Sequence, residues 1–507
     1  MRDMKKRLEM QKRGERKEFK SPGLIKLKLL FTRSYVPFWL WFGGTISGIC
    51  LIYLLFSIFS FYQKAGVVVV VGVFIFTLSL SLFHFYPKFL SGKYLALLAI
   101  LLLVTALIGR IVILLPQIPD VFVPIAFLSI FLSLFFNLFI SSFVLSVLSI
   151  LFVLVSGRFE LLPVLFSGGM IGAYGASVIH HRTDITRIGL WVGLTNLASV
   201  IGIGLIGNFS LQKIAVWGLW GIGSGIFSSI LITVSLPYFE TYFGITTDIR
   251  LLELTDLNHP LLRRLAIEAP GTYHHSILVA TLAAAAAEAV GANPLLARVG
   301  AYYHDIGKIT RPHFFFENVR IEGEGDNSHL RVNPNLSSKI ILSHVKDGLE
   351  LARIYRLPKV VVDIIAEHHG TSLIAYFYRK ALLEKRGKGS VEESSFRYPG
   401  PKPRSKESAI VMLADSVEAD SRFSSGKSHK GIESQIKRVI NNKLKDNQLD
   451  ETDLTLRDLN RIAKAFTRVM AGLSHTRGRY PEEMLKGGGE INQNQQYVER
   501  KSSHIIS

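Results

Sequence analysis

The hydrophobic residues of this chain are concentrated in its first half, whereas its second half alternates apolar and polar positions. From residue 35 to about 243 the sequence is mostly Leu, Ile, Val, Phe and Gly, and charged residues become frequent after Asp248. A membrane-spanning helix needs about 20 consecutive apolar residues. Runs of at least this length lie near 36–61, 65–86, 94–115, 121–156, 160–181, 187–207 and 212–236.

The run at 121–156 is too long for one span. We expect it to form two tight spans that turn near Asn137, because Asn interrupts an otherwise apolar stretch. The bundle would then contain eight spans.

The second half predicts helices and essentially no strands. Its apolar positions recur at helical spacing, and Pro-Gly and Gly-containing breaks separate the periodic segments. We expect Thr272 to cap one helix and Gly307 to stop another. The expected helices cover Thr272–Val290, Leu295–Ile306, Ser337–Tyr355, Lys359–His368, Ser408–Ser421, Ile432–Leu444 and Asp458–Leu473. The predicted fold is therefore all-α throughout, a polytopic membrane bundle followed by an all-helical domain.

These patterns predict four segments. They are a basic N-terminus at 1–34, a transmembrane bundle at 35–243, a helical domain at 244–485 and a disordered tail at 486–507. The tail contains Gln and Asn repeats without an apolar period, which is typical of disorder.

The positive charge of the chain is concentrated beside the first apolar run. The formal net charge is +19, and the first 33 residues contain 12 Lys or Arg and four acids. Basic residues that flank a span follow the positive-inside rule, so we expect membrane topology rather than binding to DNA or RNA. An inside N-terminus and eight spans place both termini in the cytoplasm of a multi-pass protein of the plasma membrane. The single cysteine, Cys50, excludes disulfides within one chain.

Seven His and Asp residues of the second half form a candidate metal site. Imidazoles and carboxylates are ligands for divalent metals, and a carboxylate can bridge two of them. Such a metal pair can activate water against a phosphodiester, so the residues predict a hydrolase held on a membrane. The seven residues are His275, His304, Asp305, His344, His368, His369 and Asp415.

At these positions the chain resembles the HD-domain phosphohydrolases, whose pattern is a His, a His-Asp doublet and a distal Asp. More narrowly, it resembles the bacterial seven-transmembrane receptors with an intracellular HD hydrolase domain, known as cyclic di-AMP phosphodiesterases. Members of that family carry a large extracellular domain after the first span, and that insertion is missing here. The loop at 321–334 is also lengthened. The matching stretches include Glu268–Ser276, His304–Lys308, Phe316–Asn318, Ser343–Gly348, Glu367–Gly370, Tyr398–Pro403 and Ala414–Ala419.

The resemblance implies two divalent metal ions, and family habit favours iron or manganese. Together they would activate a bridging water that opens cyclic di-AMP to linear pApA, with Asp305 and Lys308 as catalytic residues. Lys308 would stabilise charge on the phosphate. The resemblance implies that one metal is held by His275, His304, Asp305 and Asp415, and the other by Asp305, His344, His368 and His369.

Two other functions fit the same residues. The first is a non-catalytic membrane receptor that binds a cyclic dinucleotide, and the second is an HD hydrolase acting on another nucleotide phosphoester. No residue pattern identifies an adenine, so the choice of base depends on the resemblance alone. The expected partners are the cyclic dinucleotide and the lipid bilayer, and the sequence is compatible with a homodimer.

Overall fold

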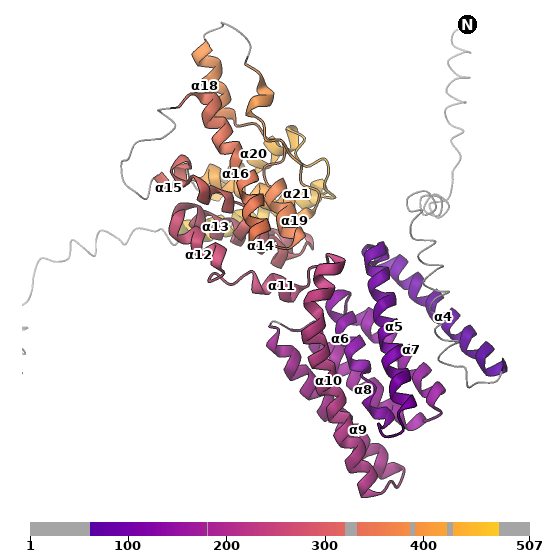
Figure 1. Ribbon diagram of the computed structural model, residues 1–507. Coiled ribbons are helices and arrows are strands. Elements are labelled where there is room, and N and C mark those ends of the chain that lie inside the picture. The colour runs from indigo at the N-terminus through magenta and orange to yellow at the C-terminus, as the bar shows by residue number, and fades with distance from the viewer. Residues whose placement is uncertain (1–60, 180, 320–331, 386–390, 423–428, 476–507) are drawn as a thin grey trace, which may run out of the picture. The chain divides into compact units, whose positions relative to one another are not determined.

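The structure is a computed structural model of the 507-residue chain. It describes residues 61–179, 181–319, 332–385, 391–422 and 429–475 (Figure 1). The predicted N-terminal segment, nearly all of the first predicted span and the predicted tail lie outside these residues. Helices and loops make up the described residues, which contain no β-strand and one isolated bridge. This confirms the predicted all-α class. The chain divides into two compact units, residues 1–249 and 250–507.

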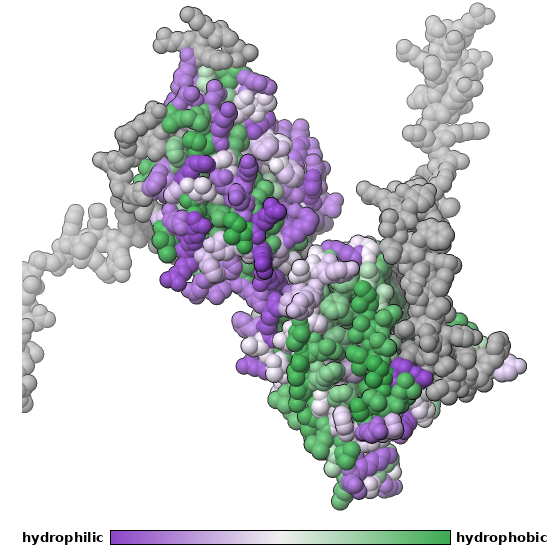
Figure 2. Space-filling model, in the orientation of Figure 1, coloured by the Kyte–Doolittle hydropathy of each residue, from purple (hydrophilic) through white to green (hydrophobic). Residues whose placement is uncertain are grey.

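The first unit is a bundle of apolar helices that follow the predicted apolar runs. Four of its helical segments are long and apolar enough to cross a membrane: 92–114, 159–177, 183–206 and 211–243. The face of this unit seen in Figure 2 is predominantly hydrophobic. The number of spans stays a prediction. The helices of the described part are α4 (Phe61–Phe85), α5 (Gly92–Leu114), α6 (Ile125–Phe135), α7 (Leu138–Ser156), α8 (Leu162–Ser177), α9 (Thr183–Ile206) and α10 (Leu211–Phe243).

The predicted break at Asn137 is confirmed. The Asn137 side chain accepts a hydrogen bond from the Ile140 amide at 2.8 Å and so caps α7. The helix before the break, α6, contains 11 residues. At 1.5 Å per residue it is about 16 Å long, whereas the hydrocarbon core is about 30 Å thick. Thus α6 by itself is too short for a full span. The Ser129 and Ser133 hydroxyls instead donate to backbone carbonyls of α8, at 2.8 and 2.7 Å.

Glycines allow the backbones of α9 and α10 to touch. A Cβ atom added to Gly225 would lie 2.4 Å from the carbonyl oxygen of Gly189 and 2.5 Å from the amide nitrogen of Gly193. Small residues permit such close approach between membrane helices. These glycines therefore permit the close packing of α9 against α10.

The second unit packs its helices around the alanine-rich α13. The buried alanines of this helix belong to one core with buried residues of α14, α19, α20 and α21. A second core joins α12, α14 and α17. The helices are α11 (Asp248–Glu253), α12 (Pro260–Glu268), α13 (Pro270–Val290), α14 (Pro294–Tyr303), α15 (Phe316–Val319), α16 (Pro334–Ile354), α17 (Lys359–Glu367), α18 (Ala375–Lys385), α19 (Lys406–Ser421), α20 (His429–Lys445) and α21 (Leu456–His475).

Two predicted helix ends are wrong. Helix α13 begins at Pro270, with Ala269 rather than Thr272 as its N-cap. Proline is well suited to the first turn because its φ angle is already helical and it has no amide hydrogen to satisfy. Helix α14 ends at Tyr303, and Gly307 lies inside the following 3₁₀ turn, η4 (Ile306–Thr310), instead of ending the helix.

Candidate metal centre

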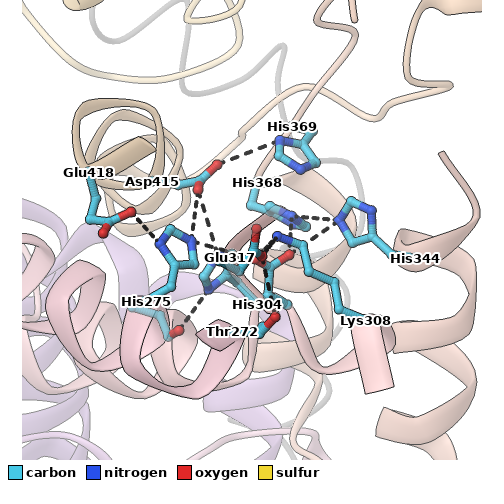
Figure 3. A network of polar contacts seen from close by, with 12 residues as sticks. Thr272, His275, His304, Lys308, Glu317, His344, His368, His369, Asp415 and Glu418 are labelled. Atoms are coloured by element: carbon cyan, nitrogen blue, oxygen red, sulfur yellow. Dashed lines mark hydrogen bonds and ion pairs between the residues drawn. The ribbon is translucent and has the colours of Figure 1, made fainter. Parts of the chain in front are cut away.

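The structure brings all seven predicted ligands into one site (Figure 3). His275 lies on α13, His344 on α16 and Asp415 on α19, while the two sequential pairs follow the ends of α14 and α17. Six of the seven are buried. The side chain of His369 is 20% exposed, more than that of any other ligand. Charged and polar residues of distant helices thus converge in the interior of the second unit.

Asp305 lies between two groups of potential ligands and faces each with a different oxygen. Its Oδ2 lies 3.2 Å from His304 Nε2 and 3.5 Å from His275 Nε2. Its Oδ1 lies 3.3 Å from His344 Nε2 and 3.6 Å from His368 Nε2. Within each group the potential ligand atoms all lie within 4.8 Å of one another. One carboxylate could therefore be shared by two cations.

Asp415 and His369 complete the two groups. Asp415 Oδ1 lies 3.1 Å from His275 Nε2, and its Oδ2 lies 3.7 Å from His369 Nδ1. The His369 ring packs on the Tyr398 ring, with centroids 4.2 Å apart. The groups are His275, His304, Asp305 and Asp415, and Asp305, His344, His368 and His369.

Four of the imidazoles are oriented by a hydrogen bond at Nδ1, which leaves Nε2 directed into the site. Such a partner fixes both the ring orientation and the tautomer of a metal-binding histidine. Three of the acceptors are backbone carbonyls three residues earlier, and the fourth is a carboxylate. The pairs are His275 with Glu418 at 2.6 Å, His304 with Ala301 at 2.7 Å, His344 with Ile341 at 2.6 Å and His368 with Ile365 at 2.8 Å.

Buried atoms without hydrogen-bond partners test whether these residues fit a metal. Among the described residues, His304 Nε2 and Asp305 Oδ1 are buried and have no such partner. A buried acceptor left unsatisfied costs about 1–3 kcal/mol. A divalent cation would satisfy both atoms, and mixed nitrogen and oxygen ligands suit such ions. The residues therefore fit a metal centre.

The protonation states of Asp305 and His344 also suit cations. Burial opposes charge on Asp305, but His304 and Lys308 outweigh it and hold the pKa of this carboxyl well below its usual value. Burial lowers the pKa of His344 to about 3. An ionised carboxylate and a neutral imidazole are the forms that bind metals.

Sequence reasoning missed Glu317, which holds Lys308 in place. Lys308 Nζ donates to Asp305 Oδ2 and to Glu317 Oε1, both at 2.7 Å. Burial opposes charge on Glu317, but the Lys308 ammonium lowers the pKa of this carboxyl to about 2. The predicted catalytic lysine is therefore bound by two carboxylates. Glu317 falls in the matching stretch Phe316–Asn318, but the stretch does not show its role, because Glu317 lies on the short helix α15 and reaches the site only through the fold.

Sequence reasoning also missed Glu418 and Arg422. Glu418 accepts the hydrogen bond from His275 Nδ1 and lies 2.7 Å from an Arg422 guanidinium nitrogen. Burial opposes the protonated form of His275, but hydrogen bonds to Asp415 and Glu418 raise its pKa to about 9. A signal was present, because Glu418 follows Asp415 by three residues and so shares its helix face.

Two family models match this chain. One is described as 7TM receptor with intracellular HD hydrolase and matches residues 61–247, and the other is the HD domain and matches residues 272–420. The cyclic-di-AMP phosphodiesterase PgpH of Bacillus subtilis is 48% identical over 307 residues, and PgpH of Listeria monocytogenes is 42% identical over 304 residues. Each match covers 60% of this chain and 42% of the relative, so the chain matches less than half the length of these curated relatives. The solved structure of the L. monocytogenes PgpH HD domain in complex with cyclic-di-AMP is 44% identical and covers 43% of this chain and 100% of that one, with a TM-score of 0.41.

Proposed function

Because the chain belongs to the family of 7TM receptors with an intracellular HD hydrolase, we propose that it is a membrane-bound, metal-dependent phosphodiesterase. Its proposed substrate is a cyclic dinucleotide, with cyclic di-AMP opened to linear pApA. Two relatives named cyclic-di-AMP phosphodiesterase support this choice. The observation that carries the proposal is the position of Asp305, which directs one carboxylate oxygen to each of two ligand groups.

The seven ligands would hold two divalent cations, with Asp305 shared between them. Iron and manganese are the proposed occupants, and the mixed His and carboxylate set is compatible with both. When bound, such a pair supplies Lewis acids for the phosphate oxygens and lowers the pKa of water.

The residues of the chain supply positioning and charge. The Nδ1 hydrogen bonds keep the imidazoles aimed at the site, and burial of six ligands keeps bulk water away from them. Lys308 places a positive charge 2.7 Å from Asp305 Oδ2. We assign Lys308 to holding this carboxylate and to electrostatic stabilisation of the phosphate. Glu317 fixes the lysine from the other side.

We further propose that the chain lies in the plasma membrane with the second unit in the cytoplasm, where nucleotides are available. The seven-transmembrane family match and the four long apolar helices support a membrane location. The orientation can be tested with a C-terminal epitope tag. The tag should be digested by protease in inside-out vesicles and protected in sealed right-side-out vesicles, and the opposite result would refute the orientation.

The activity can be tested with the full chain purified in detergent. We expect bound iron or manganese by elemental analysis, and turnover of cyclic di-AMP that is lost after chelation. Asp305→Ala should reduce kcat by at least about 100-fold, as expected when a group that positions the reacting centre is removed. Asp363→Ala is the matched control, because this aspartate is exposed and pairs with Lys359 on the surface. Retained turnover in Asp305→Ala would contradict the shared role of this carboxylate.

The same preparation separates the alternatives. A panel of cyclic dinucleotides and linear nucleotide phosphoesters would identify a different substrate. Tight binding of cyclic di-AMP without turnover, in protein that contains its metals, would identify a non-catalytic receptor.

A further inference from the structure

The ligand site opens towards His369 and Asp415. Their side chains are 20% and 12% exposed, whereas the other five ligands are at most 2% exposed. A substrate must reach the site from the side where ligands are accessible. The residues that surround this side would therefore contact the parts of a substrate that extend beyond the ligand groups.

Lys443 lies on this side of the site. It occupies the last turn of α20, and its Nζ donates a hydrogen bond to Ser372 Oγ at 2.8 Å. Ser372 follows His369 by three residues, and its amide donates to the His369 carbonyl at 3.1 Å. The half-buried ammonium is thus attached to the same short segment as the most exposed ligand. Burial lowers the pKa of Lys443, while the negative charges of Asp415 and Asp446 act in the opposite direction.

The charge of Lys443 has no direct counter-ion within the described part of the chain. No carboxylate of these residues lies within 4.0 Å of its Nζ, and its hydrogen-bond partner is a neutral hydroxyl. Neighbouring cations differ in this respect. Lys308 contacts two carboxylates, Arg422 contacts Glu418, and the guanidinium of Arg397 lies 3.1 Å from Asp446. Partial burial of an unpaired ammonium is unfavourable, and a bound anion would offset this cost.

We propose that Lys443 binds the phosphate of the cyclic dinucleotide that is not being cleaved. This inference rests on the proposed function. A cyclic dinucleotide carries two phosphodiester groups, and only the reacting one would lie at the ligand groups. The second needs a cation beside the opening. Lys443 meets this need because its charge is held there by Ser372 and is not neutralised by a carboxylate.

The test compares a substrate with two phosphates and a substrate with one. The full chain in detergent is assayed with cyclic di-AMP and with bis(p-nitrophenyl) phosphate. Lys443→Met should raise KM for cyclic di-AMP by about ten-fold or more, the value of one charge-assisted hydrogen bond, with a much smaller change in kcat. The loss of kcat/KM should be greater for cyclic di-AMP than for the single phosphodiester, by about five-fold or more. Lys443→Arg should recover at least part of the loss.

Lys445→Met is the matched control. It removes the same charge from an exposed position in the last turn of the same helix, so it reproduces any effect on the helix dipole. Its KM should stay near that of the unchanged chain. Metal content and melting temperature are measured for each variant to detect a loss of activity that is caused by misfolding. If Lys443→Met misfolds, Lys443→Arg replaces it in the comparison of the two substrates.

Three results separate the inference from the proposed function. Equal losses on the two substrates, or an unchanged KM for cyclic di-AMP in Lys443→Met, would overturn the role of Lys443. If the unchanged chain binds cyclic di-AMP without hydrolysing it, the proposed function fails and the dissociation constant replaces KM in the same comparison. If the chain neither binds nor hydrolyses it, both proposals fail.

Discussion

A methyl group at Gly307 should disrupt the metal centre without altering any ligand. Gly307 lies in η4, two residues after Asp305, and packs against the backbone of α16 at His344. A Cβ atom added to Gly307 would lie 1.9 Å from the His344 carbonyl oxygen and 2.5 Å from the Gly348 amide nitrogen. Gly307→Ala therefore places a methyl group inside the backbone of a neighbouring helix.

The size of the effect follows from these distances. Cβ atoms essentially never approach a non-bonded heavy atom closer than 3.0 Å, so the backbones of η4 and α16 must separate by at least 1.1 Å. The same movement separates Asp305 Oδ1 from His344 Nε2, now 3.3 Å apart. Metal–ligand distances tolerate changes of only about 0.2 Å, and a displacement of about 1 Å in a catalytic site can reduce the rate by about 100-fold. Overpacking of this kind also destabilises a fold by about 1–3 kcal/mol.

Elemental analysis, melting temperature and turnover of cyclic di-AMP measure this prediction. Gly307→Ala should bind less metal, with the His344 group affected most, and should lose about 100-fold in kcat/KM. Gly472→Ala is the control, because a Cβ at this exposed position in α21 would meet no atom within 4 Å. It should be neutral or stabilise the helix by up to about 1 kcal/mol. Full metal content and activity in Gly307→Ala would refute the backbone contact between η4 and α16.

Two further substitutions test the positions of single histidines. Glu418→Ala removes the acceptor that orients His275 and should lower kcat/KM by about 10- to 100-fold. Glu418→Gln keeps an acceptor and should lose less activity. Equal activity in both variants would exclude the orienting role of Glu418. The second substitution is at His259, the N-cap of α12. Its Nδ1 accepts a hydrogen bond from the Leu261 amide at 3.3 Å, and burial and the nearby Arg250 lower its pKa. The contribution of neutral His259 to the free energy of unfolding should be present above the unfolded-state pKa of about 6.5. It should be lost as the pH falls through the lower folded-state pKa. His259→Asn, which keeps a capping group of about 1 kcal/mol, should therefore show a smaller fall in melting temperature on acidification, and identical slopes would contradict the neutral cap.

Most helices of the second unit were predictable because residues close in the sequence determine their boundaries. The expected helix at Lys359–His368 is observed at Lys359–Glu367, and the one at Ser408–Ser421 is observed at Lys406–Ser421. Helical periodicity and breaking residues act over a few positions, so one sequence suffices to find them. The shortness of α6 was not predictable in this way. The run is mostly apolar on both sides of Pro124, so the apolar pattern alone does not show that the helix begins only after this proline.

The ligands themselves were identifiable, but their partners were not. His304 and Asp305 are adjacent and are of the residue types that bind metals, and the resemblance supplied the grouping of the remaining five candidate ligands. Residues such as Glu317 and Lys443 act through contacts with segments far away in the sequence. Their charges look like ordinary surface charges until the fold places them beside the site.

The arrangement around Asp305 makes the two ligand groups interdependent. Each remaining ligand belongs to one group, so its loss leaves the other group complete, whereas Asp305 serves both. Gly307 has no polar side chain, yet it also determines the geometry of the site, because it fixes the distance between Asp305 and the helix that carries His344. A close backbone contact therefore constrains this centre as strictly as the identity of its ligands. A substitution that widens the contact should act most on the group that contains His344 and, through Asp305, also on the other group, whereas a substitution of His275 should act first on the group that contains His275.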